Sequence, residues 1–284
     1  MKYTSFWTND CSLAKVVAVG NCMILDEKMR TEINFRDLGG CESVDGRVLR
    51  SGVFYRSCNL SRWNTSELYE MYRLQIRTIL DLRTDYEVYE SPDLLPADVH
   101  LDYYRVSGMR DSNSVGVDFS PEGIRRMVFG LQSLREHMQD IYLSMMYHNQ
   151  AFAFLWMMIQ ESGHLPLLFH CATGKDRTGA VSMLLLLALN IRKEDILADY
   201  VYSNVSFASR IQDAYAAHAK EIASDPSLSK KQLQENGVDP DLGKAMLDGA
   251  LSKYPDRETF FEKEYQISRE ELKAFQNSFL DAKI

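Results

Sequence analysis

The sequence predicts an α/β fold in which a central parallel or mixed sheet of about 4–5 strands is flanked by helices, with a helical region at the C-terminal end. Two patterns support this prediction. Short apolar runs of the β type alternate with amphipathic helical segments up to about residue 190, as is typical of a sheet covered by helices. From residue 193 onward the apolar spacing is helical, with breaks at prolines and glycines.

The expected strands are short and mostly apolar. Asp45-Gly46 is a typical hairpin turn, so residues 42–44 and 47–49 should pair with each other. Residues 99–106 alternate between apolar and polar types in the manner of a half-buried strand. The other expected strands cover residues 15–19, 53–55, 78–82 and 165–169.

The expected helices are marked by caps and by apolar spacing. A capping-box pattern begins at Asn64 and another at Ser268. A proline directly after Ser120 marks the start of an amphipathic stretch that continues to about residue 145. Helices are also expected over residues 150–161 and 178–189, and the second is apolar on nearly all sides, which predicts that it is buried.

We expect residues 1–284 to form a single domain with three peripheral parts. These are an N-terminal segment over residues 1–30, a helical insertion over residues 107–163 and a helical C-terminal part over residues 191–284. The insertion carries seven methionines, for which core packing is the default interpretation. The alternative is a mobile helical lid over a pocket, entered through the polar residues 107–120.

The composition limits the classes of function. The net charge of −8 and the pI near 5.3 argue against a nucleic-acid binder. The five cysteines are widely spaced without a C-x-x-C pair, so we expect no zinc cluster and no disulfide framework, but reduced thiols in a cytoplasm-like compartment. A single disulfide between Cys58 and Cys171 is the less favoured alternative, since the distance between them decides it. We see no secretory signal, and the longest apolar stretch, residues 181–191, is too short to span a bilayer. We therefore expect a cytoplasmic protein without stable membrane insertion, with export by a signal-independent route left open.

The strongest candidate site is one loop, His170 to Arg177, which reads HCATGKDR. Its pattern C-x5-R is a weak signal by itself, because the same pattern occurs from Cys41 to Arg47. The earlier loop carries two carboxylates that would repel an anion, and it opens no helix. The loop after Cys171 joins an apolar strand to an apolar helix, where backbone N–H groups and the helix dipole favour a bound anion.

The residue types in this loop fit phosphate chemistry with a cysteine nucleophile. We expect the Cys171 thiolate to attack, because a helix N-terminus and nearby cations lower a thiol pKa to about 3.5 to 7.5. Arg177 should grip two phosphoryl oxygens, and Thr178 could donate its hydroxyl to the sulfur. No metal or other cofactor is needed, and phosphate, sulfate or vanadate should occupy the site. The expected phosphate-binding residues are Ala172, Thr173, Gly174, Lys175 and Thr178.

The sequence HCATGKDRTG, which starts at His170, resembles the signature of the cysteine-based phosphatases. Its lysine and aspartate resemble one subgroup, the bacterial tyrosine and phosphoinositide phosphatases, also called tyrosine phosphatase family 3. Three more segments match: NFRDLGG from Asn34, YRS from Tyr55 and ILDLR from Ile79. The resemblance covers about residue 33 to the C-terminus.

The resemblance implies a sheet flanked by helices, no metal, and hydrolysis of phosphotyrosine through a phosphocysteine. Some family members also accept phosphoserine, phosphothreonine or phosphoinositides. A lysine at the place of Lys175 is associated with inositol phosphate recognition. Phosphotyrosine peptides or phosphoinositides are therefore the expected substrates. Cys58 departs from the pattern, since the family more often has a small residue there.

Three aspartates are candidates for the general acid, because the chain has no Trp-Pro-Asp triplet. Asp176 lies inside the loop, where a bound phosphate dianion should raise the pKa of its carboxyl group. Asp81 ends a strand and is either a donor that faces the cleft or a simple partner of Arg83. Asp140 lies on a helical stripe, where a solvated carboxylate is the simpler interpretation.

Several nearby residues are expected to support the site. His170 should orient the loop by hydrogen bonding, since neighbouring residues of a strand point in opposite directions. Arg56 is a supporting cation that either reaches a second phosphate or remains on the surface. Arg36 and Asp37 are expected to pair with each other and to pin the N-terminal segment.

Two other functions remain open. A non-catalytic module that captures phosphotyrosine or inositol phosphates would use the same cradle, although binding alone does not need Cys171. A cysteine hydrolase of acyl groups would need His170 as its base.

Overall fold

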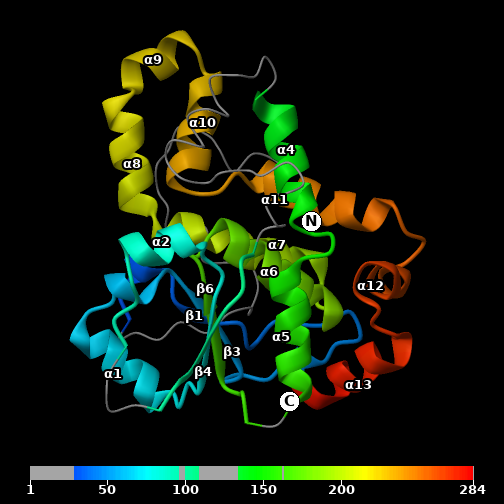
Figure 1. Ribbon diagram of the computed structural model, residues 1–284. Helices are drawn as coiled ribbons and strands as arrows, with labels where there is room; N and C mark the ends of the chain where they lie inside the picture. The colour runs from blue at the N-terminus through cyan, green and yellow to red at the C-terminus, as the bar shows by residue number, and fades with distance from the viewer. Residues whose placement is uncertain (1–28, 96–99, 109–133, 162, 284) are drawn as a thin grey trace.

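The structure is a computed structural model that describes residues 29–95, 100–108, 134–161 and 163–283. Figure 1 shows a central sheet with helices packed around it, and helices from the C-terminal half of the chain above and to the right of that sheet.

The main sheet contains β1 Arg36–Asp37, β3 Phe54–Ser57, β4 Thr78–Asp81, β5 Asp102–Arg105 and β6 Leu167–His170. The strand order is β1–β3–β6–β4–β5. The pairs β3–β6, β4–β6 and β4–β5 are parallel, whereas β1 is antiparallel to β3 at one edge. The predicted mixed sheet of 4–5 strands is therefore confirmed.

A second, two-stranded sheet pairs β2 Val48–Leu49 with β7 Leu280–Asp281. The predicted hairpin turn is present, with Gly46 at a φ of 84° and an antiparallel bridge between Glu42 and Val48. The strand β7 departs from the prediction of an all-helical C-terminal part. A strand of two residues is too short to show an alternating apolar pattern in the sequence, so only its pairing with β2 reveals it.

Helices make up most of the remaining described chain. They are α1 Thr65–Arg73, α2 Asp85–Glu90, α4 Leu134–Ser144, α5 Gln150–Gln160, α6 Asp176–Ala188, α7 Lys193–Ser206, α8 Ala208–Ala217, α9 Ala219–Ser224, α10 Ser227–Asn236, α11 Pro240–Ser252, α12 Arg257–Tyr265 and α13 Arg269–Phe279, with the 3-10 helices η2 Thr31–Ile33 and η3 Leu60–Arg62. Both predicted capping boxes form, at Asn64 before α1 and at Ser268 before α13.

Side chains of the strands alternate between the two faces of the sheet and bury both of them. On one face, Tyr55, Ile79 and Leu168 pack in a cluster with residues of α1 and of the segment before β1. On the other face, Phe54 and Leu167 belong to a larger cluster that includes residues of α5, α6 and the C-terminal helices. The sheet and the C-terminal helices thus share one hydrophobic core.

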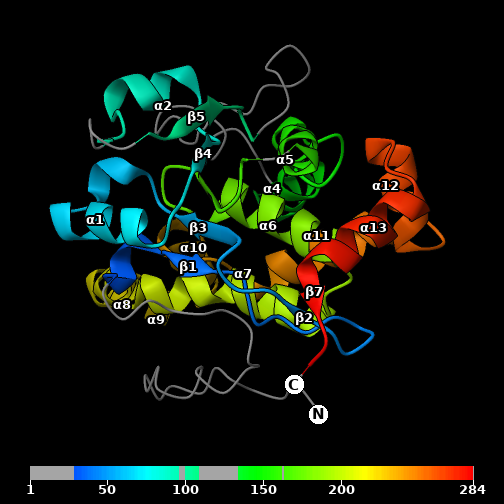
Figure 2. The same cartoon turned by 90° about the horizontal axis from the view of Figure 1, so that it is seen from below.

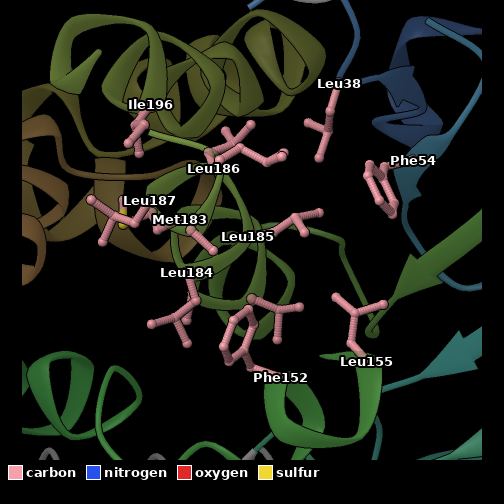
Figure 3. Close-up of a cluster of buried hydrophobic side chains, with 14 of the residues drawn as sticks. Leu38, Phe54, Phe152, Leu155, Met183, Leu184, Leu185, Leu186, Leu187 and Ile196 are labelled. Atoms are coloured by element: carbon pink, nitrogen blue, oxygen red, sulfur yellow. The ribbon is translucent and has the colours of Figure 1, made fainter. Parts of the chain in front are cut away.

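Helix α6 lies at the centre of the larger cluster. Figure 3 shows the side chains from Met183 to Leu187 spread around this helix, with Phe152 and Leu155 of α5 nearby. Every residue from Arg177 to Ala188 is buried, which confirms the prediction from the apolar pattern. A helix packed on all sides holds its first turn, and the loop before it, in a fixed position.

The described part of the predicted insertion contains α4 and α5. Met145, Met146 and Met158 are buried in the core, as the packing interpretation predicts, whereas Met157 is 48% exposed. The rest of the possible lid, the helix start expected after Ser120 and the strand expected over residues 15–19 lie outside the described residues.

The cysteines differ from one another in the structure. Cys58 and Cys171 are free thiols. Cys41 is disulfide-bonded, so the expectation of reduced thiols throughout is wrong for this residue. No helix in the described ranges combines the length and the apolar character needed to cross a bilayer.

Candidate active site

The candidate loop lies at the edge of the sheet where the parallel strands end. β6 ends at His170, and its register partners at the ends of β3 and β4 are Ser57 and Asp81. The chain turns through residues 171–175 and enters α6 at Asp176. Cys171 is only 2% exposed and lies between the strand end and the N-terminus of a 13-residue helix. This position combines backbone N–H groups with the positive end of a helix dipole.

Carbonyl oxygens of the loop are held from one side. The backbone N–H of Asn59 donates to the Ala172 oxygen at 3.4 Å. The side-chain amide of Asn34 donates to the oxygens of Thr173 at 3.4 Å and Gly174 at 2.9 Å. The N–H that follows each carbonyl in a trans peptide points in the opposite direction. The N–H groups of residues 173–175 therefore point away from these donors, and none of them donates to another described residue.

Gly174 allows the loop to pass unusually close to β3. Its φ is 70°, and a Cβ at this position would lie 2.1 Å from the carbonyl oxygen of Ser57. Only glycine fits both the left-handed backbone and this approach.

A buried ion cluster supports the loop from behind. Arg56 donates to the Gly174 oxygen at 2.8 Å and also pairs with Asp199. Arg36 donates to the same carboxylate at 2.7 Å and to Oδ1 of Asn34 at 2.6 Å. The side chains of both arginines and of Asp199 are at most 1% exposed. This cluster links β1, β3 and α7 to the candidate loop.

Two expectations are wrong at this cluster. Arg36 pairs with Asp199 rather than with Asp37, whose carboxylate instead accepts the backbone N–H groups of Gly39 and Gly52. Arg56 is fully buried instead of lying on the surface, and its Nη1 and Nη2 groups bind Asp199 and the Gly174 oxygen. Asp199 belongs to a distant helix, and no short motif connects it to these arginines.

The pKa values at the cluster follow from burial and charge. Burial acts to raise the pKa of Asp199, but the charges of Arg36 and Arg56 outweigh it and hold the pKa below its usual value. Burial and the neighbouring charge of Arg36 lower the pKa of Arg56 to about 10. The Asp199 carboxylate thus supplies the opposing charge that stabilises two adjacent buried guanidinium groups.

Arg177 pairs with Glu87 of α2 through the end of its guanidinium group. Nη1 and Nη2 donate to the two carboxylate oxygens at 2.6 and 2.5 Å. Burial acts to lower the pKa of Arg177, but the hydrogen bonds to Glu87 and the charge of Cys171 raise it above its usual value. Nε donates to no described residue, so the side of the guanidinium formed by Nε and Nη2 remains available for a ligand.

Glu87 is a site residue that sequence reasoning missed. It is the third residue of α2, where it completes a capping box with Thr84. This local pattern was visible in the sequence, but it indicates only a helix start. The contact with Arg177 joins residues 90 positions apart and appears only in the folded chain.

Asp176 is held by two groups beside the loop. Oδ1 accepts the hydroxyl of Tyr142 from α4, and Oδ2 lies 3.7 Å from the ammonium of Lys175. Tyr142 is 5% exposed, and burial together with the charge of Asp176 raises its pKa, so it remains a hydrogen-bond donor. Asp176 keeps 21% of its side chain exposed and can still meet a ligand.

The other groups of the loop make different contacts from those expected. The Lys175 ammonium donates to the carbonyl oxygens of Gln234 at 2.7 Å and Gly237 at 2.8 Å, at the C-terminal end of α10. It therefore anchors the loop to the C-terminal helices instead of presenting a free charge to a ligand. The Thr178 hydroxyl is buried and bonds to nothing in the described chain, including the Cys171 sulfur.

Asp81 lies in a separate buried cluster behind the loop. Its oxygens accept from Arg83 at 2.7 to 3.0 Å and from the Tyr103 hydroxyl at 2.6 Å, and its side chain is fully buried. The interpretation of Asp81 as a partner of Arg83 is therefore correct, and its role as a donor facing the cleft is not supported. Asp140, on α4, is exposed as expected.

His170 joins the same cluster. Nε2 lies 3.1 Å from a carboxylate oxygen of Asp93, and Nδ1 lies 3.3 Å from the Cys171 carbonyl oxygen. These contacts fit the expected orienting role. Asp81, Asp93 and His170 lie close enough to share a metal ion, but the guanidinium of Arg83 already bridges the two carboxylates at 2.7 and 2.8 Å.

The chain is similar to several bacterial phosphatases. It is 31% identical over 192 residues to a tyrosine-protein phosphatase of Cupriavidus necator, with 66% of each chain covered. It is 30% identical to the tyrosine-protein phosphatase of Nostoc commune over 55% of this chain and 50% of that protein. It is 28% identical to the triple specificity protein phosphatase PtpB of Mycobacterium tuberculosis, over 61% of this chain and 67% of that one.

These matches cover just under two thirds of the first relative's length and half of the second's. A model of the tyrosine phosphatase family matches residues 28–281, which is nearly the whole chain and includes the candidate loop, both ion clusters and the C-terminal helices. The chain belongs to the tyrosine phosphatase family.

Proposed function

We propose that this chain hydrolyses phosphotyrosine in proteins through a phosphocysteine formed at Cys171. The proposal rests on a set of free donors, here called the cradle, which face away from the groups that hold the loop's carbonyl oxygens. The N–H groups of residues 173–175 have no described acceptor, and the Nε side of Arg177 has none either. Several donors on one side of a helix N-terminus match the equatorial oxygens of a phosphoryl group. Similarity to the named tyrosine-protein phosphatases supports the same substrate class.

In the first step, the sulfur of Cys171 forms a bond to phosphorus while the bond to the leaving oxygen breaks. The loop N–H groups and Arg177 stabilise the equatorial oxygens, which carry the charge of the transition state. Thr173, Gly174 and Lys175 contribute their N–H groups to this cradle, and Thr178 is placed in the first turn of α6. Ala172 contributes the carbonyl oxygen through which Asn59 holds the loop. Water then breaks the sulfur–phosphorus bond and releases phosphate.

We assign Glu87 as the residue that positions Arg177. Its two oxygens hold Nη1 and Nη2, and this fixes the plane of the guanidinium group. A flexible arginine would lose side-chain freedom when it binds phosphate, whereas a guanidinium already fixed loses little. Burial acts to raise the pKa of Glu87, but Arg177 outweighs it and lowers the pKa, so Glu87 stays ionised at neutral pH.

We assign Asp176 as the general acid. The Tyr142 hydroxyl holds its carboxyl group beside the loop, next to the place of a bound phosphoryl group. The protonated form gives its proton to the leaving oxygen, and the resulting carboxylate accepts a proton from the attacking water in the second step.

The test of the proposed function compares the wild type with Cys171→Ser on p-nitrophenyl phosphate and on a phosphotyrosine peptide. The wild type should hydrolyse both, and inorganic phosphate or vanadate should inhibit it. The serine variant should lose turnover, because a hydroxyl is a far weaker nucleophile than a thiolate. It should still bind the peptide, and a wild type that binds the peptide without turnover would instead indicate a non-catalytic binding module.

The assignment of Asp176 predicts a dependence on the leaving group. Asp176→Asn should lower kcat for phenyl phosphate, a poor leaving group, by about 10²-fold. It should affect p-nitrophenyl phosphate far less, because that leaving group departs without a proton. Asp140→Asn is the matched control, since Asp140 is an exposed aspartate of α4. Equal losses on both substrates for Asp176→Asn, or a selective loss for Asp81→Asn, would refute the assignment.

The breadth of the substrate range is a separate question. A similar protein is named as a triple specificity phosphatase, so phosphoserine and phosphothreonine peptides belong in the substrate panel. The resemblance of Lys175 to inositol-phosphate-binding lysines adds phosphoinositides. In the structure, however, the Lys175 ammonium is bound to backbone carbonyls. We therefore rank phosphopeptides above phosphoinositides as substrates. We also propose that the enzyme consists of a single domain and acts in the cytoplasm.

A further inference from the structure

The Lys175 ammonium uses all of its N–H groups within the protein. It donates to the carbonyl oxygens of Gln234 at 2.7 Å, Gly237 at 2.8 Å and Glu235 at 3.5 Å. A lysine ammonium carries three N–H groups, so these three acceptors occupy all of them. The Lys175 side chain is also only 9% exposed. Its charge is therefore held at a fixed place beside the loop, and in this arrangement it has no donor to offer to a second phosphate.

This charge lies beside the carboxyl group that we assign as the general acid. Oδ2 of Asp176 is 3.7 Å from the ammonium nitrogen, which is too long for a hydrogen bond but close enough for a strong interaction between charges. The other oxygen, Oδ1, accepts the hydroxyl of Tyr142, whose side chain is buried. In the protonated carboxyl group, Oδ1 is thus the accepting oxygen, and the proton belongs on Oδ2.

Transfer of this proton creates a negative charge on Asp176. In the first step the bond from phosphorus to the leaving oxygen breaks, its electron pair stays on that oxygen, and the oxygen takes the proton from Oδ2. The electron pair of the broken O–H bond remains on the carboxylate. The ammonium at 3.7 Å and the Tyr142 hydroxyl both favour the charge that forms there.

We propose that Lys175 and Tyr142 are positioning residues that act through Asp176. The hydroxyl fixes which oxygen carries the proton, and the ammonium stabilises the carboxylate after the proton has left. The inference rests on the proposed function, and it gives Lys175 a role in proton transfer in place of a role in binding a second phosphate. The carbonyl groups at the end of α10 belong to the same arrangement, because they hold the ammonium in place.

The experiment compares phenyl phosphate with p-nitrophenyl phosphate by kcat/KM, which reports the steps up to the phosphocysteine. Lys175→Met removes the charge but keeps a long side chain, and Tyr142→Phe removes only the hydroxyl. Each should lower kcat/KM for phenyl phosphate by about 10-fold, a part of the effect of the acid itself. For p-nitrophenyl phosphate, whose leaving group departs without a proton, the loss should stay below about 2-fold.

Combination with Asp176→Asn separates action through the acid from damage to the loop. If both residues act through Asp176, adding Lys175→Met or Tyr142→Phe to Asp176→Asn should cause no further loss on phenyl phosphate. A displaced loop would instead weaken turnover of both substrates, and also inhibition by vanadate, in either background. The inhibition constant of vanadate should therefore be unchanged in both single variants.

The matched control for the lysine is Lys263→Met on α12. Lys263 also neighbours an acidic residue, Glu262, with 3.6 Å between ammonium and carboxylate, but both side chains are 62% exposed. Figure 2 shows α12 on the opposite flank of the molecule from α8 and α10. Tyr147→Phe is the control for the hydroxyl, since Tyr147 donates to the Gly249 carbonyl oxygen at 3.0 Å. Both controls should behave as the wild type on the two substrates.

The results that would overturn the inference are distinct from one another. Equal losses on the two substrates, or losses that add to that of Asp176→Asn, would mean that Lys175 and Tyr142 only hold the loop. An unchanged leaving-group dependence with a raised KM for an inositol bisphosphate in Lys175→Met would mean that the lysine binds a second phosphate.

Failure of this inference can be told apart from failure of the proposed function. A wild type that does not turn over p-nitrophenyl phosphate would refute the proposed function, and the inference with it. An active wild type in which Asp176→Asn shows the selective loss on phenyl phosphate, while Lys175→Met and Tyr142→Phe do not, would refute the inference alone.

Discussion

Gly174→Ala is expected to lower kcat/KM for p-nitrophenyl phosphate by about 10²-fold or more, because misplacement of catalytic groups by about 1 Å has effects of this size. The added Cβ would lie 2.1 Å from the oxygen and 2.4 Å from the carbon of the Ser57 carbonyl group. Both atoms belong to the backbone of β3, so no flexible side chain can yield. The loop must move, and its oxygen then leaves Asn34 and Arg56.

The same substitution should also destabilise the fold, and Gly46→Ala separates the two causes. Gly46 has a φ of 84°, similar to that of Gly174, but a Cβ there would meet nothing within 4 Å. Gly46→Ala should therefore cost only the left-handed backbone strain, about 1 kcal/mol, and retain activity. Urea unfolding and kcat/KM of both variants are the measurements. Equal effects of the two substitutions would show that close packing against Ser57 is unimportant.

The sequence predicted the loop well because its signal is local. A buried strand, a short loop with one glycine and a buried helix are adjacent in the chain, and Cys171 and Arg177 lie six positions apart. The expectation that Gly174 belongs to the phosphate-binding loop needed no knowledge of distant residues. The mixed sheet could be predicted for the same reason, since apolar runs and helix caps are patterns of a few residues.

The supporting residues could not be predicted from such patterns. Glu87 and Asp199 each meet the site through contacts that span 90 or more positions along the chain. The direction of a long side chain is also decided by distant partners, which is why Lys175 was expected at the phosphate and instead binds the end of α10. The same holds for Asp81, which was a candidate for the general acid. Its carboxylate is instead surrounded by Arg83 and Tyr103.

Asp199→Asn is expected to destabilise the protein by about 3 to 5 kcal/mol, the usual cost of breaking a buried ion pair by removing one partner. The amide has nearly the same shape as the carboxylate, so loss of packing does not explain this value. What remains is a pair of buried guanidinium groups, Arg36 and Arg56, with no opposing charge between them. Because Arg56 holds the Gly174 carbonyl group, turnover should fall as well.

Asp281→Asn is the control for this prediction, because Asp281 pairs with Arg50 at the surface, where both side chains are about half exposed. Its cost should be below about 1 kcal/mol. The pH dependence gives a second check. The pKa of Asp199 is lowered on folding, so its contribution is present above the ordinary carboxyl pKa and is lost as the pH falls through the lowered value. The stability difference between wild type and Asp199→Asn, measured by urea unfolding, should therefore be full at pH 7 and shrink only in strong acid. A difference of less than 1 kcal/mol at pH 7 would mean that the two arginines are solvated and that the cluster does not hold the loop.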